Sequence, residues 1–136
     1  MKNMNIIAVL DHTGEKMLMC RRRKNPYKGL LNLVGGKIEP GEDGMDAAYR
    51  ELYEETGISR EHISLIHYAD FTYYTYDVYL EVYFGRLLAP FEVYGDENEL
   101  LWADIHEDFF DMTRFAGEGN IGHIVAELRL EGLIGK

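Results

Sequence analysis

Short apolar runs separated by turn residues make up the first quarter of the chain. Residues 5–10 (NIIAVL) and 16–22 (KMLMCRR) predict two strands joined by the turn-like sequence DHTG, in which Gly14 can adopt a positive φ angle. A third apolar run, residues 31–34 (LNLV), stops at two adjacent glycines. The pattern therefore predicts a hairpin followed by a brief extended segment.

After Gly35 and Gly36 the apolar residues recur at helical spacing. Residues 43–56 place Ala47, Ala48 and Leu52 on one side of a helix, and Gly57 stands where a glycine commonly ends one. We therefore expect one central helix between strands.

The second half of the chain repeats these two patterns. Residues 63–88 are rich in Tyr, Phe, Val and Leu with partial alternation, which predicts two more strands. An acidic stretch, residues 94–99, precedes the apolar sequence LLW, and apolar side chains recur at helical spacing over residues 121–130. Strands around a central helix, with a second helix at the end, predict the α/β class with a mixed β-sheet.

Length, charge and cysteine content narrow the class of protein. The 136 residues are 46 % apolar and contain no linker, so we expect one domain over residues 1–136. The net charge of -10 repels nucleic acid polymers and anionic membranes, and the apolar stretches are too short for a signal peptide or a membrane span. The single cysteine, Cys20, cannot form an internal disulfide, which is typical of a cytoplasmic protein; the oligomeric state stays open.

The helical segment and the loop before it carry an unusual density of negative charge. Seven carboxylates occupy the seventeen positions 39–55, and Glu51, Glu54 and Glu55 project from one helix face. Like charges this close repel, and we expect the three carboxylates to converge on a divalent cation. Hard oxygen ligands suit Mg²⁺ or Mn²⁺, and Mg²⁺ commonly takes further ligands from substrate phosphates.

An ordinary explanation of this charge is a solvated helix face on which Arg50 pairs with Glu54. The order of the surrounding residues favours a metal site instead. It reads G, five residues, E, seven residues, R-E-L-x-E-E-x-G-I, and it resembles the Nudix box of the Nudix hydrolase superfamily. Nine positions within 23 residues match: Gly36, Glu42, Arg50, Glu51, Leu52, Glu54, Glu55, Gly57 and Ile58.

The resemblance implies a Nudix-type α/β/α sandwich around a mixed sheet, and hydrolysis of a nucleoside diphosphate linked to another moiety. By the same resemblance Glu51, Glu54 and Glu55 are expected to bind Mg²⁺, or Mn²⁺, and Arg50 to orient a glutamate. Glu42 would support the site. Gly35 and Gly36 would let the backbone approach the metal and the phosphates.

The sequence indicates the proton acceptor and the phosphate-binding residues less specifically than the metal-binding glutamates. Glu51 is one candidate general base, and the loop GDENE offers Glu97, with Glu99 and Asp96 as alternates; this loop could equally be an ordinary solvated one. Phosphate contacts are expected from the basic run after the second strand, and from the lysine of the Gly-Gly-Lys turn. These candidates are Arg21, Arg22 and Lys37.

Asn32, just before the box, resembles the branch of the superfamily that destroys oxidised purine nucleotides such as 8-oxo-dGTP. An amide can pair with a purine edge at two points, although Asn32 could instead bond its own backbone at a strand end. The resemblance places further base contacts in the loop FAGEGNIGH, at Glu118 and Asn120. Phe115 or Tyr27 would stack on the base.

Two other functions stay open. Some dinucleoside-polyphosphate hydrolases of the superfamily carry a tyrosine beyond the box, and Tyr73, Tyr74 and Tyr76 lie near that distance, although a tyrosine-rich segment is also typical of sheet packing. A nucleotide-binding module without activity is the third possibility. The intact glutamates argue against it, because a module that merely binds has no need of that crowding.

Overall fold

The computed structural model describes residues 1–95 and 97–136. These residues form six strands, two α-helices and one 3₁₀ helix. In chain order the elements are β1 (Lys2–Leu10), β2 (Lys16–Arg21), β3 (Leu31–Asn32), α1 (Gly44–Thr56), β4 (Ile66–Tyr73), η1 (Tyr74–Tyr76), β5 (Val78–Arg86), β6 (Glu99–Asp104) and α2 (Asn120–Leu130).

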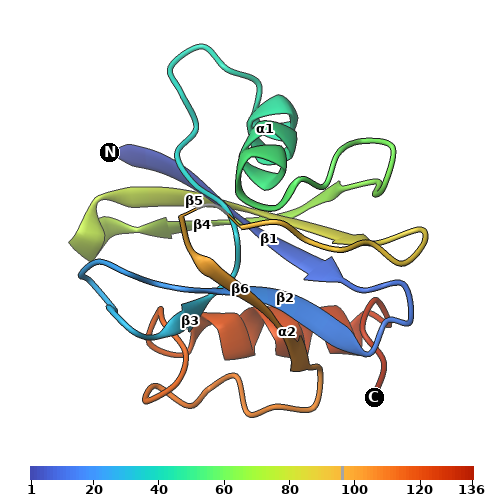
Figure 1. Cartoon of the computed structure of the whole chain (residues 1–136). Coiled ribbons are helices and arrows are strands. Elements are labelled where there is room, and N and C mark those ends of the chain that lie inside the picture. Colours follow the sequence, from blue (N-terminus) through green and yellow to red (C-terminus); the bar gives the residue numbers. More distant parts are fainter. Residues whose placement is uncertain (96) are drawn as a thin grey trace.

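The strands form one mixed sheet with a helix on each face. Strand order is β3-β2-β1-β5-β4, and β6 pairs with β2. Strands β1 and β5 run parallel, whereas the other neighbours are antiparallel. Helix α1 covers one face and α2 the other (Figure 1). The predicted α/β/α sandwich around a mixed sheet is confirmed.

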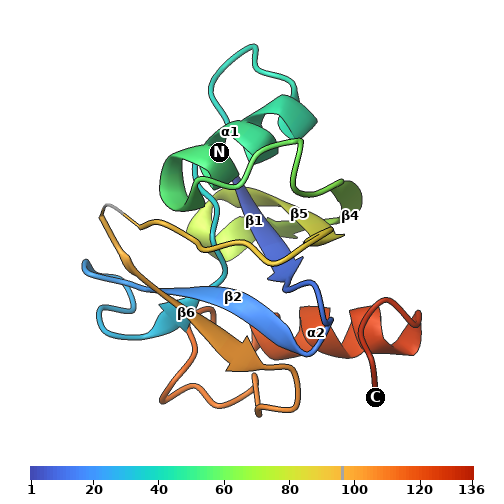
Figure 2. The ribbon, with the colours of Figure 1, turned by 45° about the vertical axis from the view of Figure 1, so that its right-hand side comes forward.

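The hairpin predicted at the start of the chain forms, but its two strands separate. Cα pairing of β1 with β2 is restricted to Leu10 and Met17. Toward the start of β1 the two strands diverge, as Figures 1 and 2 show. Residues 34–38 run along the β1 side of this opening, where the N–H of Ile7 donates to the carbonyl of Val34 (2.8 Å). The glycine turn is thereby held inside the sheet rather than on its rim.

Strand β1 is buried on both faces, which explains its continuous apolar run. Ile6 and Ala8 belong to the core beneath α2, whereas Ile7 and Val9 belong to the core beneath α1. Because successive side chains of a strand point to opposite faces, a strand covered on both sides needs apolar residues at every position. The sheet therefore packs tightly between the two helices on either side of the opening between β1 and β2.

Both predicted helices are confirmed within one residue of their expected starts. Asp43 caps the N-terminus of α1 by accepting a hydrogen bond from the N–H of Asp46 (3.2 Å), and Gly57 ends the helix with φ 80°. Helix α2 begins at Asn120. In the part of the chain that the structure describes, neither helix is long and apolar enough to cross a membrane.

Two strands differ from their predicted bounds. Strand β1 begins at Lys2, three residues before the apolar run, because the register with β5 extends to the Lys2–Val78 pair. The third apolar run is a strand over two residues, Leu31–Asn32, after which Val34 makes an isolated bridge to Ile7. Both differences arise at the opening between β1 and β2, where pairing depends on distant segments.

Candidate active site

Helix α1 brings the three predicted metal-binding glutamates to the opening in the sheet. Ala48 and Leu52 are fully buried against the sheet, so the rotation of α1 about its axis is fixed. Glu51 and Glu55 lie half-buried next to this apolar stripe, and Glu54 is exposed at its edge. The helix therefore presents a row of carboxylates at the border between core and solvent.

Arg50 ties these carboxylates to the preceding loop. Its guanidinium donates two hydrogen bonds to Glu42 (2.7 and 2.9 Å), one to Glu51 (3.0 Å) and one to Glu54 (3.3 Å). A fifth hydrogen bond goes to the carbonyl of Lys37 (3.0 Å). The bonds from Arg50 lower the pKa of Glu42 to about 2. Arg50 thus fixes Glu42 as a permanent anion.

The two glycines allow the loop to contact both the strand and the helix closely. A Cβ at Gly36 would overlap the carboxylate of Glu51, and a Cβ at Gly35 would overlap the carbonyl of Asn5. Gly35 also has φ 149°, which favours glycine. The N–H of Gly35 donates to Oε1 of Glu55 (3.1 Å).

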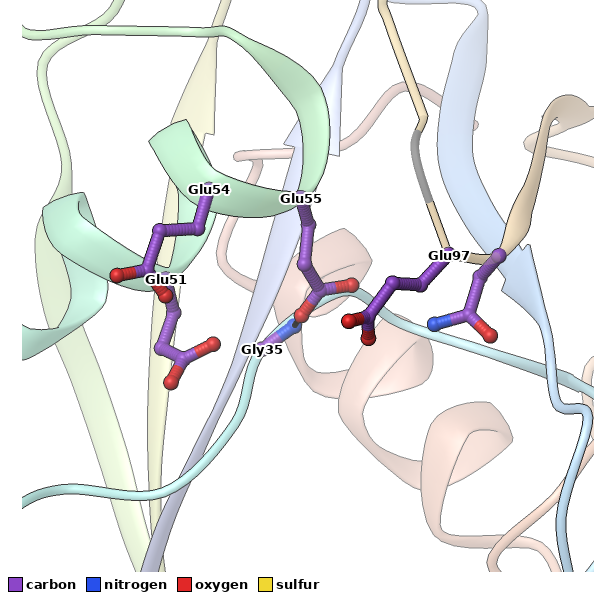
Figure 3. A pocket seen from close by; sticks show the side chains of 6 residues that line it. Gly35, Glu51, Glu54, Glu55 and Glu97 are labelled. Atoms are coloured by element: carbon purple, nitrogen blue, oxygen red, sulfur yellow. Dashed lines mark hydrogen bonds between the residues drawn. The ribbon is translucent and has the colours of Figure 1, made fainter.

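The glutamates line a cavity of about 360 Å³, called here the acidic cavity. Its lining residues are Gly35, Glu51, Glu54, Glu55, Glu97 and Asn98. Figure 3 shows the α1 glutamates on one side and Glu97 on the other, with Gly35 between them. Five of the predicted catalytic and metal-binding residues therefore share one space.

Burial and mutual repulsion raise the proton affinity of this cavity. The pKa of Glu55 is raised to about 7, chiefly by burial and also by the charges of Glu51, Glu97 and Glu54, whereas the N–H of Gly35 opposes the rise. Burial likewise raises the pKa of Glu51, against the lowering influence of Arg50. The negative charge of the cavity is incompletely compensated by protein groups.

These properties fit a hard divalent cation. Carboxylate oxygens are the donors that Mg²⁺ and Mn²⁺ prefer, and the glycine turn leaves room beside them. The predicted convergence of Glu51, Glu54 and Glu55 is looser than expected, however. Among the described residues, no three acidic, histidine or cysteine side chains lie close enough together to form a metal cage. The physical reason is Arg50, which holds Glu51 and Glu54, whereas Glu55 turns to Gly35.

A second, larger opening continues from the acidic cavity between the diverging strands. Its volume is about 1410 Å³, and we call it the large cavity. Gly35, Glu55, Glu97 and Asn98 line both spaces, so the two are continuous. Apolar and aromatic side chains make up much of the wall: Met4, Ile6, Leu33, Phe71, Tyr73, Val78 and Leu80. The combination provides an anionic end for a metal and an apolar end for a flat ring.

All three predicted base-binding residues line the large cavity. Asn32 accepts a hydrogen bond from the N–H of Leu33 through its Oδ1 (2.9 Å), as expected of a strand-end asparagine. The Oδ1 of Asn120 is buried and has no hydrogen-bond donor among the described residues. Glu118 accepts from the hydroxyls of Tyr27 (3.1 Å) and Tyr76 (3.1 and 3.2 Å). We call this three-residue arrangement the tyrosine clasp.

The predicted phosphate-binding residues are placed unequally. Arg22 lines the large cavity and donates to the carbonyl of Pro26 (2.7 Å). Arg21 pairs with Glu99 (3.1 Å) and lines neither cavity, and Lys37 is exposed outside both.

The candidate general bases of the GDENE loop and the candidate stacking residues differ in whether they reach a cavity. Among the acidic residues of the GDENE loop, Glu97 faces the cavity, Glu99 is engaged with Arg21, and Asp96 lies outside the described residues. The expectation that Phe115 stacks on a base is wrong, because this ring is 1 % exposed and packs against Phe109 in the core.

Tyr27, the other candidate for stacking, lines the large cavity, as do Tyr73 and Tyr76. Among the lining residues that were not predicted from the sequence are two amides, Asn5 and Asn98. The sequence contains one indication of Asn5, because it is the single polar residue in the apolar run of residues 5–10, on a strand buried on both faces.

Comparison with known proteins identifies the family. Residues 1–121 match the family model described as the NUDIX domain. Curated relatives match over part of the chain, and two of them serve as examples. The mouse protein "Nucleoside diphosphate-linked moiety X motif 6" is 44 % identical over 59 residues, which is 43 % of this chain and 18 % of that protein. The CTP pyrophosphohydrolase of Escherichia coli is 38 % identical over 53 residues, 39 % of each chain. The matched segments thus span well under half of these relatives.

Solved structures show the same fold over almost the whole chain. The Ap4A hydrolase of C. elegans superposes with a TM-score of 0.75 at 16 % identity, covering 93 % of this chain and 96 % of that one. A MutT structure from a study of Aliivibrio salmonicida and Vibrio cholerae gives a TM-score of 0.71 at 18 % identity, covering 93 % and 94 %. At these identities the likeness concerns the fold. The family model, which covers most of the chain, shows that the protein belongs to the Nudix family.

Proposed function

We propose that this protein is a Mg²⁺-dependent pyrophosphohydrolase of nucleoside triphosphates. It would cleave purine nucleotides, with oxidised purines such as 8-oxo-dGTP preferred, to the nucleoside monophosphate and pyrophosphate. The observation that carries the proposal is the continuity of the two cavities. A carboxylate-lined space suited to a cation and phosphates opens directly into an apolar space with amide groups suited to a purine.

Residues of the acidic cavity would bind the anhydride and manage the proton of water. Water adds to a phosphorus atom, the anhydride P–O bond breaks, and a proton of water passes to a carboxylate. Glu51 and Glu97 are the candidate acceptors, on opposite sides of the cavity (Figure 3). A divalent cation held by Glu51, Glu54 and Glu55 would neutralise charge on the phosphates and lower the pKa of bound water.

Arg50 would orient rather than react. Its bonds to Glu42, Glu51 and Glu54 leave it no role in binding substrate, but they set the carboxylate positions before the cation arrives. A bidentate guanidinium–carboxylate pair has a fixed geometry, and a lysine cannot form such a pair.

Base recognition would come from the amides of the large cavity. Asn32 keeps its Nδ2 available for a purine acceptor while its Oδ1 is engaged by Leu33. Asn120 offers its Oδ1, an acceptor that has no donor in the part of the chain that the structure describes. Together the two amides present one donor and one acceptor to a purine edge, which is the two-point pattern that distinguishes bases.

A second candidate function has one observation in its favour. The large cavity, at about 1410 Å³, exceeds the usual range of roughly 300–1,000 Å³ for small-molecule sites. A dinucleoside polyphosphate would use the additional volume, with Tyr73 or Tyr76 against the second base. The alternative is therefore tested beside the first.

Chromatographic identification of the nucleotide products from a substrate panel, with pyrophosphate measured for the triphosphates, tests the proposal. The panel contains 8-oxo-dGTP, dGTP, dCTP, ADP-ribose and diadenosine tetraphosphate, each with and without Mg²⁺. We expect Mg²⁺-dependent release of pyrophosphate, fastest from 8-oxo-dGTP. Faster turnover of diadenosine tetraphosphate would establish the second candidate instead. No turnover of any substrate, with Mg²⁺ affinity unchanged in Glu54→Gln, would leave a nucleotide-binding module and remove both enzymatic functions.

A further inference from the structure

Asn5 is a buried polar side chain whose hydrogen bonding is incomplete. Asn5 and Thr56 are the two fully buried polar residues in the part of the chain that the structure describes, with exposed fractions of 1 % and 0 %. The hydroxyl of Thr56 donates to the carbonyl of Leu52 (2.6 Å) and accepts from the N–H of Ile58 (3.1 Å). The Nδ2 of Asn5, in contrast, has no acceptor among the described residues. Such a group normally finds a partner, because leaving it without one costs free energy.

The orientation of this amide is fixed by the glycine turn. The N–H of Gly36 donates to Oδ1 of Asn5 (2.9 Å), and the backbone N–H of Asn5 donates to the carbonyl of Gly36 (2.8 Å). Rotating the amide by half a turn would set its NH₂ group against the N–H of Gly36, so that two donors would face each other. The NH₂ group of Asn5 is therefore the end left to bind something else.

Asn5 lies where the two cavities meet. It lines the large cavity together with Gly35 and Glu55, both of which also line the acidic cavity. In the proposed function the anhydride occupies the acidic cavity, and the base occupies the far part of the large cavity near Asn32 and Asn120. The part of a nucleotide that passes Asn5 is then the sugar with its first phosphate.

We propose that Asn5 contacts the substrate, its Nδ2 donating a hydrogen bond to an oxygen of the nucleotide's sugar or first phosphate. Through Oδ1 the same side chain holds Gly36 against Glu51. The inference rests on the proposed function and adds a specificity contact to it. Because Asn5 is 1 % exposed, the oxygen must seat directly against β1. The two oxygen sources are a sugar hydroxyl and the first phosphate.

Equilibrium binding by calorimetry tests this contact without turnover. The substitution is Asn5→Leu, which keeps the branched arrangement of four side-chain heavy atoms and removes the amide. Asn3→Leu is the matched control, because Asn3 lies on the same strand but is exposed. The ligands are dGMP, its 2′,3′-dideoxy analogue, and deoxyguanosine, and Mg²⁺ affinity and Tm are measured in parallel.

The ligand pattern separates contact from structure. We expect Asn5→Leu to weaken dGMP binding at least about 10-fold while Asn3→Leu leaves it unchanged. If the acceptor is a sugar hydroxyl, the dideoxy analogue binds wild type and Asn5→Leu equally. If the acceptor is the phosphate, deoxyguanosine binds wild type and Asn5→Leu equally. An equal loss for all three ligands, accompanied by lower Tm and Mg²⁺ affinity, or no loss at all, overturns the contact.

Two further outcomes keep this inference distinct from the proposed function. Wild-type protein that binds dGMP but hydrolyses no nucleotide refutes the activity, and the Asn5 contact is still decided by the affinities. Wild-type protein that hydrolyses nucleotides while Asn5→Leu binds dGMP normally refutes the contact and leaves the activity standing. If Asn5→Leu fails to fold, Asn5→Ser removes the same Nδ2 donor with a smaller change, and the same ligand pattern is expected.

Discussion

The acidic cavity and the large cavity share four lining residues, yet they are held together by different forces. In the acidic cavity charged groups are fixed by directional bonds, chiefly those of Arg50 and of the N–H of Gly35. The large cavity has largely apolar walls on diverging strands, and its amide and charged side chains are spread among them. Changes in the first should therefore affect every substrate alike, whereas changes in the second should alter the choice among substrates.

The largest expected effect belongs to the acidic cavity. Glu51→Gln removes a charge that both binds the cation and serves as a candidate base, so we expect kcat/KM to fall about 10³-fold or more on every nucleotide. Steady-state kinetics on purine and pyrimidine triphosphates measure it. Glu39→Gln is the matched control, because Glu39 is exposed in the loop before α1 and lines neither cavity. A loss confined to purines would contradict the division between the two regions.

The pH dependence of stability should also originate in the acidic cavity. The pKa of Glu55 is about 7 in the folded protein, above its usual value near 4.5, so the folded state retains a proton that the unfolded state has lost. Stability of the metal-free protein should therefore fall as pH rises from about 4.5 to 7, by roughly 2–3 kcal/mol.

Urea unfolding between pH 4.5 and 8 in a chelating buffer measures this slope. Glu55→Gln should flatten it, since a glutamine accepts the bond from Gly35 without titrating. Glu61→Gln, at an exposed position, should leave it as in wild type. Parallel profiles for wild type and Glu55→Gln would show that burial of Glu55 does not govern the titration.

A smaller and selective effect is expected in the large cavity. Asn32→Ala removes a base contact worth about 1–3 kcal/mol, which corresponds to a rise in KM of roughly 5- to 150-fold for oxidised purines. Mg²⁺ affinity should stay unchanged, because Asn32 does not line the acidic cavity. Kinetics on 8-oxo-dGTP and dCTP measure the difference. Equal losses on both substrates would remove Asn32 from base recognition.

The sequence predicted the acidic cavity better than the large one because of distance along the chain. Glu51, Glu54 and Glu55 lie within two helical turns, and the spacing alone places them on one face. The spacing could not show which groups these carboxylates bind. Arg50 donates to Glu51, whereas the N–H of Gly35 donates to Glu55. A local pattern predicts position but not the pairing of charges.

The large cavity depends on contacts between distant segments. No local pattern indicates that Phe115 lies in the core beneath α2, or that the hydroxyl of Tyr76 donates to Glu118, 42 positions away. Such choices follow from how β1 and β2 diverge, and that divergence depends on the pairing of β1 with β5 and of β2 with β6. Helix periods and cap residues contain no information on it.

The smallest effect concerns the tyrosine clasp. The hydroxyl of Tyr76 donates to both carboxylate oxygens of Glu118, so a purine N–H must compete with it for the same acceptor. Tyr76→Phe removes one of the two hydroxyls that donate to Glu118 and leaves that of Tyr27, and we expect KM for purine triphosphates to fall by about 2- to 5-fold, the size of one exposed hydrogen bond. KM for dCTP should not change. Tyr74→Phe is the control, since Tyr74 is 83 % exposed and lines neither cavity. A rise in KM after Tyr76→Phe would instead mean that the clasp holds Glu118 in its binding orientation.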